Sequence, residues 1–110
     1  MALPLTNFQA LPLQVPTTPT VIYTSPVGYN TIFLQVQILN PDIQERNISL
    51  NFVRGASSVE LFKTYNIPAG EILYITGGGG KMILEPGDSW ELSGSSNLLT
   101  FYGSLLQTLK

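Results

Sequence analysis

The sequence contains no cysteine and no histidine among its 110 residues. Without cysteine it can form neither a disulfide nor a thiolate metal site. Without histidine it lacks the usual general base near neutral pH and the commonest protein ligand for metal ions. Catalytic groups of the Ser-His-Asp or Cys-His type are excluded. We therefore predict that the chain is not an enzyme, and that it has no catalytic residues, no metal site and no cofactor.

Charged residues are also scarce, at 11% of the sequence, whereas typical soluble proteins have about 25%. The basic residues do not cluster as binding to a phosphate backbone requires, so we predict no nucleic-acid partner. No apolar run approaches the roughly 18 residues of a membrane-spanning helix, and we predict no membrane association. Because interface cores are depleted of charge, the low charge fits either a neutral polar exterior or an exterior partly covered by a partner.

Prolines are concentrated near the start of the chain, where residues 1–19 hold four of the eight. Proline fixes the backbone φ angle and cannot donate to a β-ladder, so this stretch should be extended and partly polyproline-like. It is too apolar for an idle linker, and we predict an N-terminal arm that packs on its own domain or on a neighbouring subunit. The residues expected to act in assembly more than in folding are Leu3, Leu5, Phe8, Leu11 and Leu13. The alternative is a ragged terminus with one edge strand at Leu13–Val15.

Residues 20–110 show short strand patterns separated by turn signals, with no helical period longer than a turn. The spacing predicts an all-β fold, an antiparallel β-sandwich of about eight strands that follows the extended N-terminal arm. Short hairpins between successive strands are the expected source of the antiparallel pairing. The predicted strands are residues 20–25, 29–40, 47–54, 59–67, 71–76, 81–85, 89–93 and 98–106.

Alternation of apolar and polar residues assigns faces to some of these strands. Residues 98–106 are apolar on both faces, which predicts a central strand or one covered by a partner. In residues 29–40, one face is expected to point into the core, and it carries Ile32, Leu34, Val36 and Ile38.

Four residues are predicted to shape structural turns. Pro68 and Gly70 mark one tight connection between strands, and Pro86 and Gly87 mark another. Pro86 and Gly87 fit the two central positions of a type II turn, where only glycine readily takes a positive φ angle.

Two patterns suggest chemistry but lack what that chemistry needs. The glycines at 77–80 precede Lys81, as in a phosphate-binding loop. Such a loop also requires a glycine six residues before the lysine and a Ser or Thr directly after it, and this sequence has neither. Glu85, Asp88 and Glu91 are spaced by three, and carboxylates can bind calcium or hydrolyse glycosides. Strand alternation separates them and no calcium-loop motif is present, so we predict a solvated turn.

Four aromatic residues raise one further binding function. Trp90, Tyr65, Tyr74 and Tyr102 could form a platform on which the apolar face of a sugar stacks. The alternative, which we favour, is a tryptophan in the core with tyrosines on the strand faces, because aromatic side chains dominate the cores of β-sandwiches.

The sequence resembles a group of small virion proteins of tailed bacteriophages over about residues 20–106. Three segments carry the resemblance: TVIYTSPVGYNTIFLQVQILN, YNIPAGEILYITGGGGKMILEPGDSWELSGSS and LLTFYGSLL. Within them, the matching motifs are Ile67-Pro68-Ala69-Gly70, Gly79-Gly80-Lys81 and Leu84-Glu85-Pro86-Gly87-Asp88. The long glycine run and Trp90 depart from the pattern of this group.

The resemblance implies a β-sandwich subunit without catalytic residues that assembles on a phage particle, as a capsid decoration (cement) protein or as a head–tail or tail component. Of these we predict capsid decoration. We predict a homo-oligomer, expected to be a trimer, whose partners are other virion proteins such as the major capsid protein. The expected location is the virion, after synthesis in the host cytoplasm. A neck or tail subunit is the alternative within this class. A carbohydrate-binding module that uses Trp90 and the surface tyrosines is the alternative from another class.

Overall fold

The computed structural model describes residues 6–75 and 82–110. Within these ranges all regular secondary structure is β-strand, and no helix there is long and apolar enough to cross a membrane. The strands are β1 (Thr6–Gln14), β2 (Thr20–Thr24), β3 (Tyr29–Leu39), β4 (Arg46–Arg54), β5 (Ser57–Ile67), β6 (Ile72–Tyr74), β7 (Met82–Leu84), β8 (Ser89–Gly94) and β9 (Thr100–Leu109).

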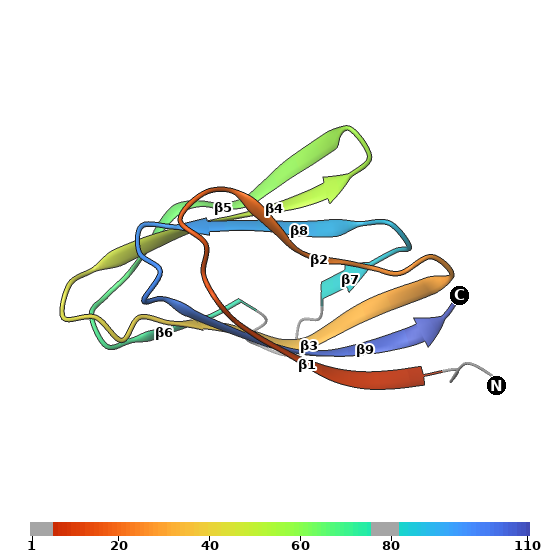
Figure 1. Ribbon diagram of the computed structural model, residues 1–110, viewed down its shortest axis with the longest axis horizontal. Helices are drawn as coiled ribbons and strands as arrows, with labels where there is room; N and C mark the ends of the chain where they lie inside the picture. Colours follow the sequence, from red (N-terminus) through yellow and green to blue (C-terminus); the bar gives the residue numbers. More distant parts are fainter. Residues whose placement is uncertain (1–5, 76–81) are drawn as a thin grey trace.

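The strands form two sheets that pack face to face (Figure 1). The five-stranded sheet has the order β1-β9-β3-β6, and β7 also pairs with β3, at the opposite end from β6. The four-stranded sheet has the order β2-β8-β4-β5. Every described pairing is antiparallel. The predicted all-β antiparallel sandwich is confirmed.

The strand connections differ from those that the sequence suggested. Among the described strands, only β4 and β5 are neighbours both along the chain and within a sheet. β9, for example, lies between β1 and β3, which is the central position that its apolar faces predicted. The antiparallel pairing arises mostly from connections that cross from one sheet to the other, so the expectation of short hairpins is wrong.

The N-terminal segment belongs to the sandwich from Thr6 onward. β1 pairs with β9 along its whole length. The edge strand considered at Leu13–Val15 therefore begins earlier, at Thr6, and ends at Gln14. Pro12 is tolerated there because β1 is an edge strand, with a neighbour on one side only. Leu3 and Leu5 lie outside the described residues.

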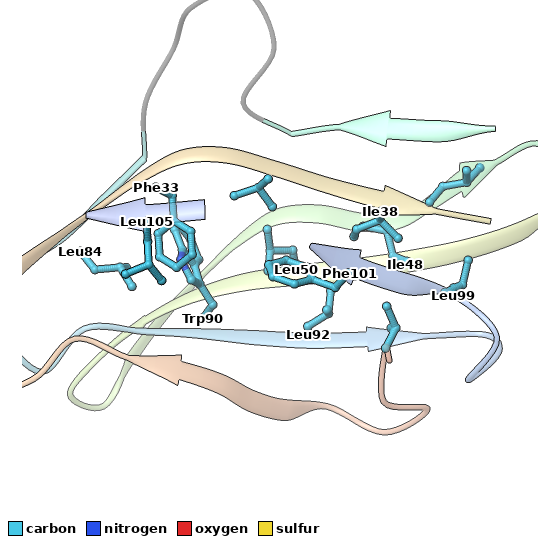
Figure 2. Packing of buried hydrophobic residues seen from close by; sticks show 13 residues of the cluster. Phe33, Ile38, Ile48, Leu50, Leu84, Trp90, Leu92, Leu99, Phe101 and Leu105 are labelled. Atoms are coloured by element: carbon cyan, nitrogen blue, oxygen red, sulfur yellow. The ribbon is translucent and has the colours of Figure 1, made fainter. Parts of the chain in front are cut away.

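The core lies between the two sheets (Figure 2). Trp90 of β8 is 4% exposed, and its ring meets those of Phe33 and Phe52 edge-to-face at centroid distances of 5.9 and 5.8 Å. Tyr23 meets Phe33 in the same way at 5.4 Å. Edge-to-face contact is a preferred aromatic geometry, so these rings tie the sheets together. Other buried apolar side chains include Ile38, Ile48, Leu50, Ile67, Leu84, Leu92, Leu99, Phe101 and Leu105.

A β-bulge in β3 changes which side chains point into the core. The register with β9 shifts by one residue at Leu34, and a shift of one residue moves the following side chains to the other face. After the bulge, Val36 and Ile38 are buried as predicted. Before it, Phe33 is buried, whereas Ile32 and Leu34 lie on the outer face. The prediction that all four apolar residues of this strand share the core face is therefore wrong for Ile32 and Leu34.

The buried side chain of Asn40 fixes the end of β3. Its Nδ2 donates hydrogen bonds to the carbonyl oxygens of Gln44 and Ile67, both at 2.9 Å. Its Oδ1 accepts a hydrogen bond from the backbone amide of Asp42 at 3.1 Å. One side chain thus joins the loop after β3 to the end of β5 in the other sheet.

Hydroxyl groups link the sheets at the opposite end of β3. Thr31 Oγ1 hydrogen-bonds to Ser25 Oγ at 2.8 Å and to the Tyr23 hydroxyl at 2.9 Å. Gln107 Nε2 donates to the same tyrosine hydroxyl at 2.8 Å. The buried hydroxyl groups of Ser25 and Thr31 are thus satisfied by neutral partners, and the network joins the two sheets without burying a charge.

Candidate interaction surface

The strands of the five-stranded sheet contain no charged residue. The side chains that these strands direct away from the core are therefore all neutral, and we call this outer surface the neutral face. The strands of the four-stranded sheet, in contrast, carry Arg46, Arg54, Glu60, Lys63 and Glu91. The few charged residues within the strands are thus unevenly distributed, because the strands of the four-stranded sheet carry them and the strands of the five-stranded sheet do not.

Four apolar side chains lie next to one another across the neutral face. Phe8 of β1 is opposite Leu106 of β9. Leu106 is opposite Ile32 of β3, which is in turn opposite Ile83 of β7. Phe8 is 72% exposed and Ile83 59% exposed, while the two between them are half-buried. Because directly opposed side chains in antiparallel strands are within contact distance, the four form one continuous strip, which we call the apolar row.

A second line of paired residues crosses the same face. Tyr102 of β9 lies between Pro12 of β1 and Gln37 of β3, and Gln37 is opposite Tyr74 of β6. We call these four residues the tyrosine row. Gln35 Nε2 donates to Gln37 Oε1 at 3.0 Å, so part of the amide hydrogen bonding is satisfied within the face. Between the two rows lie Ala10, Ser104, Gln35 and Leu34.

The predicted assembly residues of the N-terminal segment divide between two faces. Phe8 lies on the neutral face, where it begins the apolar row. Leu11 and Leu13 point the other way and pack against the core. Alternation along β1 explains the division, since successive side chains of a strand take opposite faces.

The four aromatic residues considered as a sugar platform do not come together. Trp90 is buried between the sheets and presents no ring face to a sugar. Tyr74 and Tyr102 belong to the tyrosine row of the neutral face. Tyr65 lies on β5 in the other sheet, where it packs edge-to-face against Phe62 at a centroid distance of 5.4 Å. A platform that includes Trp90 is therefore incompatible with the packing.

The two proline–glycine connections adopt tight turns. Gly70 has φ of 73°, and the amide of Glu71 donates to the carbonyl of Pro68 at 3.2 Å. Gly87 follows Pro86 with φ of 86°, and the amide of Asp88 donates to the carbonyl of Glu85 at 2.9 Å. A positive φ at the third residue with this hydrogen bond is the geometry of a type II turn.

The carboxylates near the second turn are held by basic side chains. Asp88 is buried and accepts hydrogen bonds from Arg54 Nε at 2.9 Å and Nη2 at 2.7 Å. Arg54 Nη2 also contacts Glu85 at 2.8 Å, and Lys110 Nζ lies 3.7 Å from the same carboxylate. Glu91 stands apart on β8, where it accepts a hydrogen bond from Asn51 at 3.2 Å. The expected solvated turn is instead a partly buried ion-pair network.

The ion-pair network favours the ionised form of Asp88. The hydrogen bonds from Arg54 hold the pKa of Asp88 below its usual value, against the opposing effect of burial. A carboxylate kept ionised in this way is a poor proton donor near neutral pH. Within the described ranges, no three His, Cys, Asp or Glu side chains form a group that could hold a metal ion.

A surface groove of about 320 Å³ lies where β5 ends and β6 begins, lined by residues 65–68 and 71–73. Its ionisable groups are Tyr65 and Glu71, and no second carboxylate or basic side chain is part of the lining. The groove could accept an apolar or hydrogen-bonding side chain of a partner.

Both long edge strands are protected against pairing with another strand. β1 carries Pro12, which has no amide hydrogen to donate. β5 has two register shifts against β4, and Thr64 adopts a φ of 50° there while its amide donates to Ser49 Oγ at 2.9 Å. Such bulges twist an edge away from flat pairing, and Glu60 and Lys63 add charge to it. The neutral face has no comparable protection.

Comparison with known proteins gives likenesses in structure but not in sequence. One similar structure is a protein of Bacillus endospore appendages, which are described as a novel family of disulfide-linked pili. The TM-score is 0.52 and the sequence identity 10%, and the match covers 96% of this chain and 88% of that one. A pentameric capsid protein isolated from metagenomic phage sequences matches with a TM-score of 0.44 and 13% identity over 87% of this chain and 59% of that one. At 10% identity, the first likeness concerns the fold alone. No protein-family model matches the sequence, and no curated protein matches it.

Proposed function

We propose that this chain is a non-enzymatic structural subunit of a tailed-phage particle, which decorates or cements the capsid shell as an oligomer. The observation that carries the proposal is the neutral face, with its exposed apolar row and its lack of charge. The resemblance of residues 20–106 to small phage virion proteins supplies the phage context. No cofactor enters the proposal.

Exposure of the apolar row favours assembly over a free monomer. Large exposed apolar patches on soluble proteins mark surfaces that contact a partner. Complete burial of a Phe or Ile side chain is worth about 1.5–3 kcal/mol, so covering Phe8 and Ile83, which are each more than half exposed, would stabilise an assembly by about 3 kcal/mol. A shell or fibre subunit gains this energy in every copy.

The likeness to the spore appendage protein is compatible with a structural role but does not specify the particle. That protein is described as forming disulfide-linked pili. The present sequence contains no cysteine, so it cannot form disulfides with its neighbours, and an uncharged apolar surface is one way to provide contacts between subunits. A neck or tail subunit would use the same surface and is the alternative within this proposal.

Immunogold electron microscopy of purified phage particles tests the proposal. We expect antibodies against the chain to label the capsid shell. Label confined to the neck or tail would replace decoration by the alternative position. Absence of label from intact particles, with the chain recovered only in the soluble fraction of infected cells, would contradict a virion role.

A further inference from the structure

We infer that the neutral face is covered by the neutral face of a second copy of the chain, in a contact with two-fold symmetry. The inference rests on the proposed structural role, because it names the partner of the surface that carries that role. In a two-fold contact each copy offers the same patch to the other. The neutral face therefore has to be complementary to itself in charge, in size and in its pattern of side chains.

Charge favours a second copy over a partner with an ordinary surface. Roughly one quarter of the residues of a typical soluble protein are charged. Covering the apolar row with such a surface would remove water from those charges without offering them a partner of opposite sign. A second copy brings the same uncharged strands. Self-association thus buries the apolar row against strands that carry no charge.

The size of the neutral face meets the need of a stable contact. It is four strands wide, and its central strand β9 has ten residues. With strands about 4.8 Å apart and a rise of about 3.4 Å per residue, the flat footprint is about 600 Å². Specific interfaces bury about 600–1,000 Å² on each partner. Side-chain relief makes the accessible area larger than the footprint, so one face is large enough.

The two long edge strands are poor sites for self-association by strand pairing. Addition of a strand to β1 would meet Pro12, and addition to β5 would meet the bulge at Thr64. Both features disfavour continuous hydrogen-bonded pairing between chains. A face-to-face contact needs no free backbone groups, because side chains from two sheet faces interdigitate, as they do inside a β-sandwich.

The pattern of side chains selects between two symmetric arrangements. With the two-fold axis parallel to the strands, the apolar row of one copy lies on the apolar row of the other, and Phe8 approaches Ile83 of the second copy. With the axis across the strands, the apolar row lies on the tyrosine row, and the amide of Gln37 is buried against apolar side chains at a cost. The geometry points to the first arrangement.

Light scattering on the full chain tests the contact. We expect the wild type to have twice the mass of one chain and a Phe8→Lys, Ile83→Lys double variant to be a monomer. The matched control is Val27→Lys, because Val27 is 93% exposed outside the strands of the neutral face and should leave the dimer intact. Circular dichroism should show that the double variant is folded, since both side chains are mostly exposed in the monomer.

Cysteine cross-linking tests how the two copies are oriented. Because the natural sequence has no cysteine, only the introduced cysteines can form a disulfide. Phe8 and Ile83 are three strand spacings apart within one chain, about 14 Å, which is too far for an internal disulfide. Mixing the single variants Phe8→Cys and Ile83→Cys under mild oxidation should give a covalent heterodimer on a non-reducing gel. The assigned arrangement would be overturned if two copies of the same single variant formed a disulfide and the mixture gave no covalent heterodimer.

The outcomes separate this inference from the proposed function. A monomeric wild type, or a wild type and a double variant of equal mass, would overturn the two-fold contact even if antibodies label the phage shell. A trimer, the oligomer that the sequence analysis predicted, would also overturn it, because a closed two-fold contact joins an even number of copies. A dimer with the expected cross-link would support the contact even if particles carry no label.

Discussion

At the scale of single residues, Asn40 offers a sharp test because its amide nitrogen faces carbonyl oxygens of two different segments. In Asn40→Asp, a carboxylate of the same shape would face those oxygens without a proton to donate. We expect a loss of about 2–4 kcal/mol in the free energy of unfolding, measured by urea denaturation at pH 7. Asn97→Asp, in an exposed turn, is the matched control. Equal stability of the two variants would contradict the hydrogen bonds assigned to Asn40.

Asp88 should contribute stability that depends on pH. Arg54 lowers the pKa of Asp88 in the folded state, so the unfolded chain takes up a proton first as the pH falls. The contribution is therefore present above about pH 4, the usual value for an unfolded aspartate, and is lost as the pH falls further. Asp88→Asn should lower the free energy of unfolding at pH 7 by about 1–3 kcal/mol.

The difference between wild type and Asp88→Asn should shrink in urea denaturation curves recorded below pH 4. Glu85→Gln is the control from the same network. Its side chain is half exposed, and exposed ion pairs contribute about 0–1 kcal/mol. A stability gap between wild type and Asp88→Asn that is constant across this pH range would show that the carboxylate charge is not the cause.

The structural role of a residue could be predicted from the sequence where that role depends only on its neighbours along the chain. The Pro86–Gly87 turn needs only a fixed proline φ and a glycine with positive φ, and both are visible in the sequence. The burial of Trp90 follows from alternation within its strand. The role of Asn40 was not predictable, because one of its hydrogen-bond partners is 27 residues away along the chain.

At the scale of elements, β1 contains a matched pair of substitutions on opposite faces. Leu13→Ala removes a half-buried side chain that packs on the core and should cost about 1–2 kcal/mol of unfolding free energy. Phe8→Ala removes a mostly exposed side chain and should change the stability of the monomer by less than about 0.5 kcal/mol. Urea denaturation of dilute samples measures both. The opposite order of effects would mean that β1 does not pair with β9 in the register described.

The bulge in β3 shows where pattern-based assignment of faces fails. Alternation alone places Ile32 and Leu34 with Val36 and Ile38, and no proline or glycine marks the interruption. The shift becomes apparent only from the pairing with β9. The same error hid the candidate surface, because Ile32 was assigned to the core although it belongs to the apolar row. The sequence does show that these strands lack charged residues, and this feature could have indicated the neutral face.

At the scale of the whole molecule, the strand order follows from contacts that the sequence does not display. Most paired strands are distant along the chain, such as β1 with β9 and β2 with β8. Composition and turn signals predict that a sandwich forms, since strands with apolar faces must cover one another. They do not determine which strand lies beside which, because several orders would bury the same apolar residues.

The proposed dimer should respond to salt as an uncharged interface does. Raising sodium chloride from about 0.01 to 1 M shortens the screening length from about 30 to 3 Å, which weakens contacts between exposed charges. The strands of the neutral face have no charges to screen, so sedimentation equilibrium should give the same dissociation constant at both concentrations. Sulfate should tighten the dimer, because it strengthens apolar association. Dissociation by sodium chloride would place the charged loops or the four-stranded sheet in the contact, and would exclude the neutral face as its main surface.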